Sequence, residues 1–261
     1  MKNQRLDLSR RKLLFGALQG TSLILLSGCE KMFNSLQQNK KFVSLLESTE
    51  SLTRSVQRFV TGKHKLAQEF AERDISRTFK ANGNPPPITM DYIADATRQW
   101  TQWRLKISGL VKQPAQFSLV ELKSMPSRSQ ITRHDCVEGW SAIGKWKGVP
   151  LTEITERVQP TSEARYVVFH CMDTDDQGTA YYESIDLIDA SHPQTILAYE
   201  MNDRPLPIEH GAPLRLRIEN QLGYKHAKYI RAIEFVADYK SIQQGKGGYW
   251  EDQGYEWYAG I

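Results

Sequence analysis

The sequence has few cysteines and lacks several motifs that mark common enzyme classes. Its 261 residues include three cysteines, Cys29, Cys136 and Cys171, and no two of them form a C-x-x-C pair. The H-E-x-x-H and G-x-S-x-G motifs are absent, and the glycines of QGKGGYW are not followed by the Ser or Thr of a phosphate loop. These absences weaken the dithiol, zinc-protease, serine-hydrolase and P-loop classes.

The sequence also lacks an excess of either charge outside its N-terminus. Lys and Arg total 34 and Asp and Glu total 30, but residues 1–28 hold five of the bases and one of the acids. The remaining chain therefore carries 29 residues of each sign. This balance gives no electrostatic basis for general nucleic-acid binding, so we expect no nucleic-acid partner.

The N-terminus has the features of an export signal rather than of a membrane-spanning helix. Its apolar run from Leu13 to Leu26 is shorter than the roughly 20 residues that cross a hydrocarbon core of about 30 Å. Arg10-Arg11 resembles a twin-arginine signal, which exports folded proteins, and LLSGC resembles a bacterial lipobox. We predict a signal over 1–28 and a periplasmic protein anchored to a membrane by lipid on Cys29. The alternative is a soluble protein cut by ordinary signal peptidase.

A helical segment is predicted between the signal and the main domain. Apolar residues recur at helical spacing between polar ones, which predicts one or two amphipathic helices within 29–75. Gly83 and Pro85 to Pro87 then end any helix and force an extended path. The spaced apolar residues are Phe42, Leu45, Leu46, Leu52, Val56, Phe59 and Val60.

The remainder, 76–261, mixes strand and helix patterns. Strict alternation in WRLKISGL predicts a half-buried strand that ends at Gly109. Further strands are predicted at 165–171, 213–219 and 228–237, and short helices after 118–125, after 150–158 and around 184–193. Because these elements interleave without a regular βαβ order, we predict an α+β domain of mixed sheets with short helices.

The stretch RHDCVEGW places Cys136 among polar and aromatic residues, where a core cysteine is not expected. In an oxidising compartment Cys136 could pair with Cys171 in a disulfide. It could also be a nucleophile, or a zinc ligand with His134 and His170, although the spacings are a weak match to zinc sites. A single thiolate also suits a metal centre whose other ligands come from an organic cofactor.

The sequence around Cys136 resembles a known family. TRHDCVEGWSAIGKWKGVPL is similar to the cysteine loop of molybdopterin-binding oxidoreductases of the sulfite oxidase superfamily, in particular the branch of the periplasmic methionine sulfoxide reductases. The similarity continues through FKANGNPPP, YVVFHC, EHGAPLRL and GYKHAKY to the aromatic tail, and covers roughly Ile75 to Ile261. It implies a sulfite-oxidase-like fold and a molybdenum-molybdopterin cofactor.

The resemblance also implies roles for individual residues. Cys136 takes the place of the thiolate ligand of molybdenum, and Tyr181 that of a tyrosine facing the substrate. Arg215 and Lys228 offer the cations that suit the phosphate of the pterin. The full set implied to contact the cofactor is Phe79, Asn82, Gly83, Asn84, Cys171, His210, Arg215, His226, Ala227 and Lys228.

The residues after Cys136 bear on the substrate. Sulfite oxidases carry arginines there, whereas this chain has Val137, Glu138, Gly139 and Trp140, and a carboxylate would repel a dianion. We therefore expect two-electron reduction of an S- or N-oxide rather than sulfite oxidation.

The same resemblance implies how the enzyme works with other components. The sequence has no haem-binding C-x-x-C-H, so electrons must come from a separate membrane haem protein or cytochrome. We expect a monomer, because no C-terminal immunoglobulin-like domain follows the last predicted strand. The alternative is a non-catalytic periplasmic lipoprotein, a binding or accessory module with the same fold.

Overall fold

The structure is a computed structural model that describes residues 65–261. The predicted signal over 1–28, Cys29 and most of the predicted helical segment lie outside the described residues. Within 65–75 the chain is extended apart from the short 3-10 helix η1 (Glu72–Asp74). No helix of the described part is both long and apolar enough to cross a membrane.

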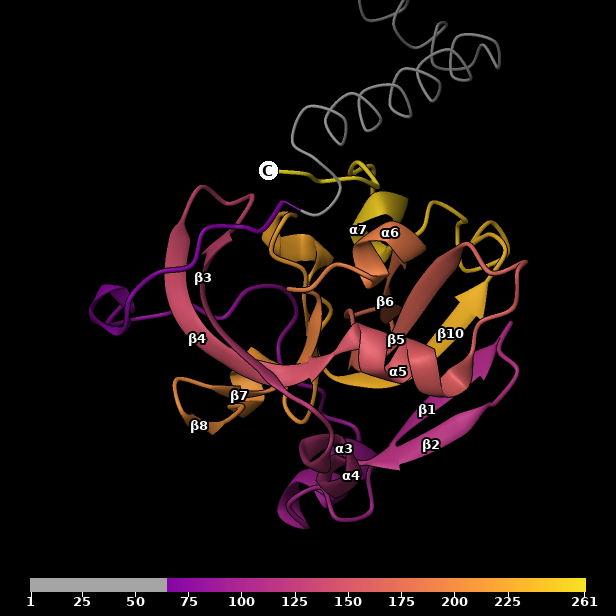
Figure 1. Ribbon diagram of the computed structural model, residues 1–261, viewed down its shortest axis with the longest axis horizontal. Coiled ribbons are helices and arrows are strands. Elements are labelled where there is room, and N and C mark those ends of the chain that lie inside the picture. Colours follow the sequence, from indigo (N-terminus) through magenta and orange to yellow (C-terminus); the bar gives the residue numbers. More distant parts are fainter. Residues whose placement is uncertain (1–64) are drawn as a thin grey trace, which may run out of the picture. The chain divides into compact units, whose positions relative to one another are not determined.

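Two β-sheets form the framework of the described unit (Figure 1). The first sheet has the order β2 (Ala115–Ser118), β1 (Arg104–Gly109), β10 (Ile230–Val236), β5 (Tyr166–Thr174) and β6 (Ala180–Asp186). The second contains β3 (Arg128–Asp135), β4 (Ser141–Pro150), β7 (Ile196–Met201) and β8 (Arg204–Pro205), with β9 (Arg215–Arg217) paired to β7. Only β1 and β10 pair in parallel among these strands.

Short helices connect the strands, which confirms the predicted α+β class. Two 3-10 helices, η2 (Ile208–His210) and η3 (Gly223–Lys225), flank β9. The predicted helices occupy the stretches 118–125 and 150–158 themselves rather than following them. α4 begins within the stretch because Ser118 and Glu121 form a capping box, in which each side chain hydrogen-bonds to the backbone of the other residue. The α-helices are α3 (Met90–Thr97), α4 (Leu119–Ser124), α5 (Leu151–Val158), α6 (Leu187–Ala190) and α7 (Tyr249–Asp252).

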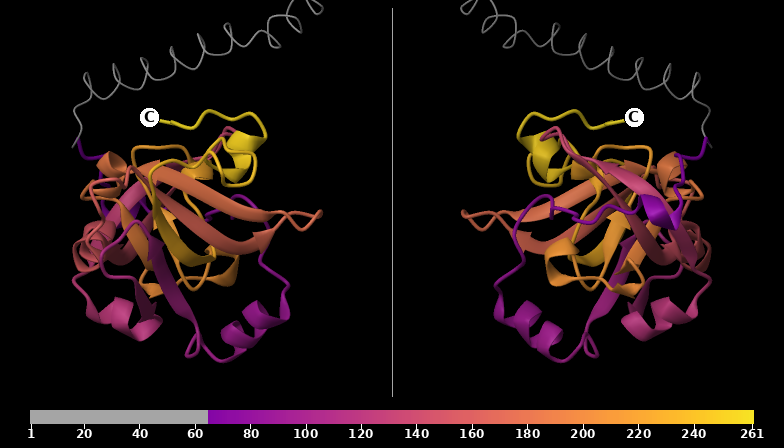
Figure 2. Two further views of the ribbon diagram at one scale, coloured as in Figure 1. Left: turned by 90° about the vertical axis from the view of Figure 1, so that its right-hand side faces the viewer. Right: turned by 90° about the vertical axis from the view of Figure 1, so that its left-hand side faces the viewer.

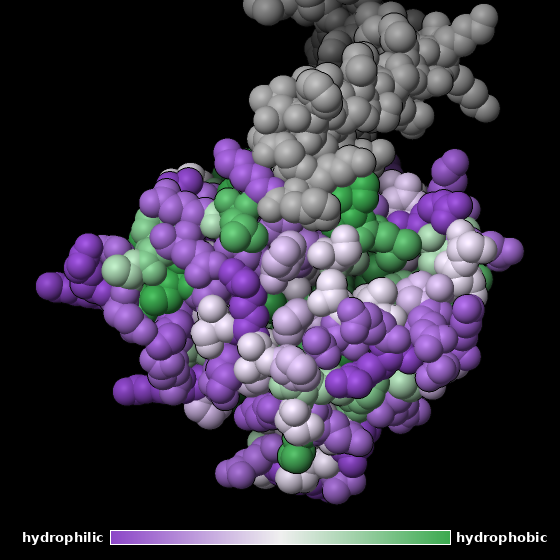
Figure 3. All heavy atoms as spheres, in the orientation of Figure 1, coloured by the Kyte–Doolittle hydropathy of each residue, from purple (hydrophilic) through white to green (hydrophobic). Residues whose placement is uncertain are grey.

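The main hydrophobic core is built from strands whose apolar residues alternate. Leu105 and Ile107 of β1 are buried, as the alternation predicts, and they pack in one cluster with Val167 and Phe169 of β5. A smaller cluster surrounds Trp146 of β4. On the face drawn in Figure 3, hydrophilic side chains predominate, with scattered apolar ones between them.

Segments distant in sequence meet around the functional site. The C-terminal segment with α7 lies at one end of the described unit, beside the sheet that contains β6 (Figure 2). The extended segment before α3 reaches the turn at η3, where Asn82 donates a hydrogen bond to the Gly223 carbonyl at 3.1 Å. These two segments and the loop after β3 line one cavity.

Candidate active site

A cavity of about 290 Å³ opens where these segments meet. Its wall combines the segment before α3, the loop after β3, the facing ends of β5 and β6, the residues after η3, and the C-terminal segment. The lining residues are Asn82, Gly83, Asn84, Pro85, Cys136, Val137, Glu138, Asp173, Tyr181, Tyr224, His226, Lys228, Trp250 and Tyr255.

Cys136 lies in the tight loop that joins β3 to β4. Its backbone N–H donates to the Trp140 carbonyl at 2.9 Å, and the Gly139 N–H donates back to the Cys136 carbonyl at 3.0 Å. Gly139 has φ +84°, a left-handed conformation that favours glycine. The loop holds the half-buried Cys136 thiol in the cavity wall, where burial raises its pKa. A bound metal ion would reverse that shift by stabilising the thiolate.

Three alternatives for Cys136 lose support. Both described cysteines are free, so the disulfide with Cys171 is absent. No group of three His, Cys, Asp or Glu side chains in residues 65–261 has the arrangement of a metal site, which weakens zinc. His134 is not available as the base for a nucleophilic Cys136, because its Nδ1 already accepts a hydrogen bond from Arg217 at 3.0 Å.

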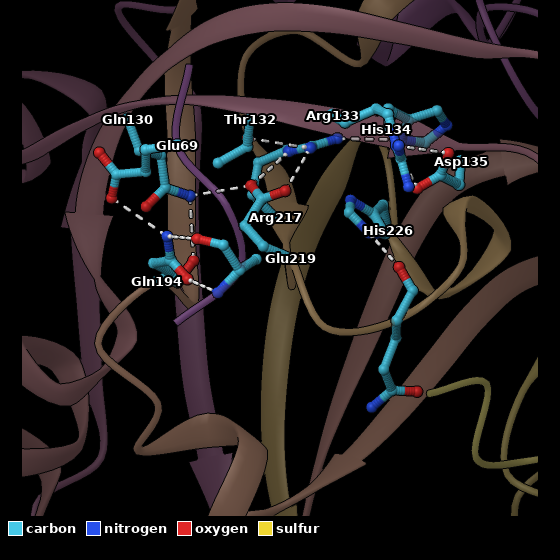
Figure 4. Close-up of polar contacts among 12 residues, drawn as sticks. Glu69, Gln130, Thr132, Arg133, His134, Asp135, Gln194, Arg217, Glu219 and His226 are labelled. Carbon is cyan, nitrogen blue, oxygen red and sulfur yellow. Dashed lines mark hydrogen bonds and ion pairs between the residues drawn. The ribbon is translucent and has the colours of Figure 1, made fainter. Parts of the chain in front are cut away.

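Four cations are buried in the described part of the chain, and two of them have carboxylate partners. Arg217 donates to the Glu219 carboxylate from Nε at 2.9 Å and from Nη2 at 2.6 Å, as Figure 4 shows. Lys225 contacts Glu183 and Glu251. Such pairing compensates the cost of removing charge from water. The other two buried cations are Arg215 and Lys228.

Arg215 and Lys228 are held by neutral acceptors instead. Arg215 donates to the His210 carbonyl at 3.0 Å and reaches Asn82 Oδ1 at 3.5 Å. Lys228 donates to the carbonyls of Asn84 at 2.8 Å and Glu209 at 3.3 Å. Burial lowers the pKa of Arg215 to about 9 and that of Lys228 to about 8. A bound anion would compensate both charges, as the phosphate of a cofactor does.

Unpartnered polar atoms surround the same region. In the described structure, His134 Nε2, His210 Nδ1, His226 Nδ1, Asn84 Nδ2 and Arg215 Nε are buried without a hydrogen-bond partner. Buried polar groups in folded proteins are nearly always satisfied, so a cluster of unsatisfied ones fits a site that receives a polar ligand. Together with the two unpaired cations, they fit a polar and anionic cofactor.

Glu138 lines the cavity but does not present a free negative charge. Its carboxylate accepts hydrogen bonds from Lys80 Nζ at 2.7 Å and Trp140 Nε1 at 2.9 Å. Two other cations near the loop pair elsewhere, Arg133 with Asp135 and Lys145 with Glu72 and Asp203. Lys80 is therefore the cation that compensates Glu138.

The structure brings seven of the predicted site residues into the cavity wall and places five behind it. Tyr181 is in the wall, but its hydroxyl already donates to the Tyr224 carbonyl at 2.6 Å. Phe79 lies behind the wall, against the rings of His134 and His210. The wall residues are Asn82, Gly83, Asn84, Cys136, Tyr181, His226 and Lys228; those not lining it are Phe79, Cys171, His210, Arg215 and Ala227.

Several residues of the site were not predicted from the sequence. Asp173, Tyr224, Trp250 and Tyr255 line the cavity, and Lys80 pairs with a lining residue. One signal was available for Asp173, since a carboxylate directly after the apolar strand YVVFHCM is unusual for a core strand. Lys80 has no local signal, because its partner is 58 residues away.

Comparisons with known proteins agree with these features. Residues 92–243 match the family described as "Oxidoreductase molybdopterin binding domain". A candidate protein-methionine-sulfoxide reductase subunit of Azospira oryzae, YedZ1, is 37% identical over 254 residues, which are 97% of this chain and 88% of that protein.

Two further similarities are partial. The protein-methionine-sulfoxide reductase catalytic subunit MsrP of Xanthomonas campestris pv. campestris is 39% identical over 153 residues, 55% of this chain and 48% of that protein. The match thus spans about half the length of the Xanthomonas protein. Among solved structures, the sulfane dehydrogenase SoxCD of Paracoccus pantotrophus is similar over 67% of this chain and 46% of that chain, with a TM-score of 0.49 and 18% identity.

Proposed function

Because this chain belongs to the oxidoreductase molybdopterin binding domain family, within the sulfite oxidase superfamily, we propose that it is the catalytic subunit of a reductase that removes oxygen from organic S-oxides. Family membership confirms the predicted enzyme class and the sulfite-oxidase-like fold. It favours an enzyme over the non-catalytic lipoprotein. The S-oxide substrate is the part of the proposal that the cavity supports.

We propose that residues in the cavity wall and directly behind it hold a molybdenum-pterin cofactor. Cys136 would supply the thiolate ligand of the metal, and Arg215 and Lys228 would bind the pterin phosphate. The unpaired nitrogens of His210 and His226 would satisfy polar atoms of the pterin. When bound, such a cofactor supplies two-electron transfer of an oxygen atom.

The apolar mouth of the cavity is the observation that carries the substrate proposal. Val137 and Tyr255 line the mouth and are 44% and 41% exposed, and the Trp250 ring lies 5.4 Å from that of Tyr255. Aromatic rings make favourable contacts with sulfur, so this rim suits the apolar groups of a sulfoxide and its thioether product. Sulfite would need cations at the mouth, but no arginine lines the cavity and its one lysine, Lys228, is assigned to the pterin phosphate.

We further propose the cellular setting from the sequence signals and the relatives. The domain over 76–261 would be exported folded, and lipid on Cys29 would tether it to a membrane facing the periplasm. The related proteins are named as subunits, which supports a separate partner that supplies electrons. A membrane haem protein suits that role, because the sequence has no haem-attachment motif of its own.

Metal analysis and turnover test the proposal together. Full-length protein exported by its own signal should carry about one molybdenum per chain, and Cys136→Ser should lose it. Cys171→Ser is the matched control and should keep it, since Cys171 does not line the cavity. With reduced viologen as electron donor, the wild type should reduce sulfoxides faster than N-oxides. With ferricyanide as electron acceptor, it should not oxidise sulfite. Sulfite oxidation as the fastest reaction would refute the substrate assignment.

A further inference from the structure

Asp173 is a buried carboxyl in the cavity wall, and one of its two oxygens has no partner in the described structure. It lies near the end of β5, where alternation turns Cys171 and Asp173 inward while Thr174 is exposed. The residue is 2% exposed, and its Oδ1 has no hydrogen-bond partner among the described residues. It forms no salt bridge in the described structure, although Lys228 lines the same cavity.

The groups that face Asp173 do not hold it ionised. Lys228 is the cation whose charge lowers the pKa of Asp173, but its ammonium group donates its hydrogen bonds to two backbone carbonyls. The other titratable neighbours, from β5, β6, α3, α7 and the residue before β10, are a thiol and four phenols. Burial raises the pKa of Asp173 to about 7, against the opposing effects of Lys228 and Asn84. The thiol is that of Cys171, and the four phenols are those of Tyr181, Tyr92, Tyr249 and Tyr229.

Reduction of an S-oxide consumes protons. The S–O bond breaks, the sulfur gains two electrons, and the oxygen leaves as water after taking up two protons. The electrons come from the separate reductant, so the protons must reach the oxygen from groups in the cavity wall or from solvent. An acidic side chain positioned beside the departing oxygen lowers the activation free energy of S–O cleavage.

We propose that Asp173 is a catalytic residue, which donates one of these two protons from its carboxyl group to the departing oxygen. The resulting carboxylate regains a proton from solvent before the next turnover. This role rests on the proposed S-oxide reduction.

Three other ionisable or hydroxyl groups of the wall already have partners. The Tyr181 hydroxyl donates to the Tyr224 carbonyl, and the Glu138 carboxylate is ion-paired with Lys80. Lys228 binds two carbonyls. Asp173 is thus the lining group that combines burial, an unused oxygen and a transferable proton.

Asp173→Asn tests the role, because asparagine keeps the size and polarity of the side chain but lacks the acidic proton. With cofactor-loaded full chain, dimethyl sulfoxide and reduced viologen, the variant should lose roughly 100-fold in kcat. Wild-type kcat should fall as the pH rises through about 7, where Asp173 ionises, and the variant should lack this fall. Asp176→Asn, which changes an exposed carboxylate in the adjacent turn, should keep the wild-type rate and pH profile.

A second measurement does not depend on turnover. Infrared spectra of the wild type should show a protonated carboxyl band that disappears near pH 7 and is missing from Asp173→Asn, while the molybdenum content of the variant stays unchanged. A wild type that reduces no S-oxide would refute the proposed function. A wild type that turns over, with an Asp173→Asn variant that keeps its rate and pH profile, or without a carboxyl titrating near pH 7, would refute only the role of Asp173.

Discussion

Replacing Asp173 by asparagine should stabilise the fold more at pH 8 than at pH 5. The pKa of this buried carboxyl rises from its usual 3.8 to about 7, so the folded protein holds a proton that the unfolded chain has released over that range. Stability from this group is therefore greatest below pH 4 and falls as the pH rises toward 7. The folded and unfolded pKa values of Asp173 differ by about three units. This difference lowers the free energy of unfolding by about 4 kcal/mol at pH 8, and by between about 1 and 2 kcal/mol at pH 5.

Urea unfolding of the full chain at both pH values measures this difference. The free energy of unfolding of Asp173→Asn, relative to the wild type, should increase by about 3 kcal/mol from pH 5 to pH 8, because asparagine does not titrate. Asp176→Asn serves as the control and should show no such trend, since the Asp176 side chain is exposed. If the free energy of unfolding of Asp173→Asn relative to the wild type is the same at pH 5 and pH 8, the raised pKa of Asp173 is refuted.

Three further changes test the packing and the charges around the cavity. Lys225→Met should destabilise the fold by about 3–5 kcal/mol in urea unfolding, because two buried carboxylates lose their partner, whereas Lys147→Met, at a half-exposed pair, should change little. Lys228→Met should weaken cofactor retention about 10- to 100-fold, measured as molybdenum content after dialysis, and unchanged content would argue against a phosphate contact. Trp146→Ala should cost about 3–5 kcal/mol, since Trp146 is fully buried in the smaller core cluster; a loss below 1 kcal/mol by urea unfolding would contradict that packing.

Hydrophobic alternation made some strands predictable from the sequence and left others hidden. β1 and β5 were predicted because their buried residues are apolar, such as Leu105 and Val167. β3 was missed because the residues on its buried face are Gln130, Thr132 and His134, which are all polar. They are tolerated there because Gln130 and Thr132 hydrogen-bond to the ion pair of Arg217 and Glu219, and His134 to Arg217. A polar buried face has no hydrophobic signal to detect.

The part of the site that was predicted came from the resemblance of short segments to the family. It identified the loop around Cys136, the segment 82–84, Tyr181, His226 and Lys228, which all line the cavity. Asp173 and Lys80 acquire their roles from partners that only the fold brings near. Their protonation and pairing depend on burial and distance, which the sequence does not encode locally.

The wall of the cavity also sets an order for the maturation of the enzyme. Its residues run from Asn82 to Tyr255, and α7 is fastened to the residues after β9 by the contact of Glu251 with Lys225. The ribosome must therefore release almost the whole domain before the final wall can close. A cofactor can therefore be enclosed by the full wall only once the chain has been made almost to its end.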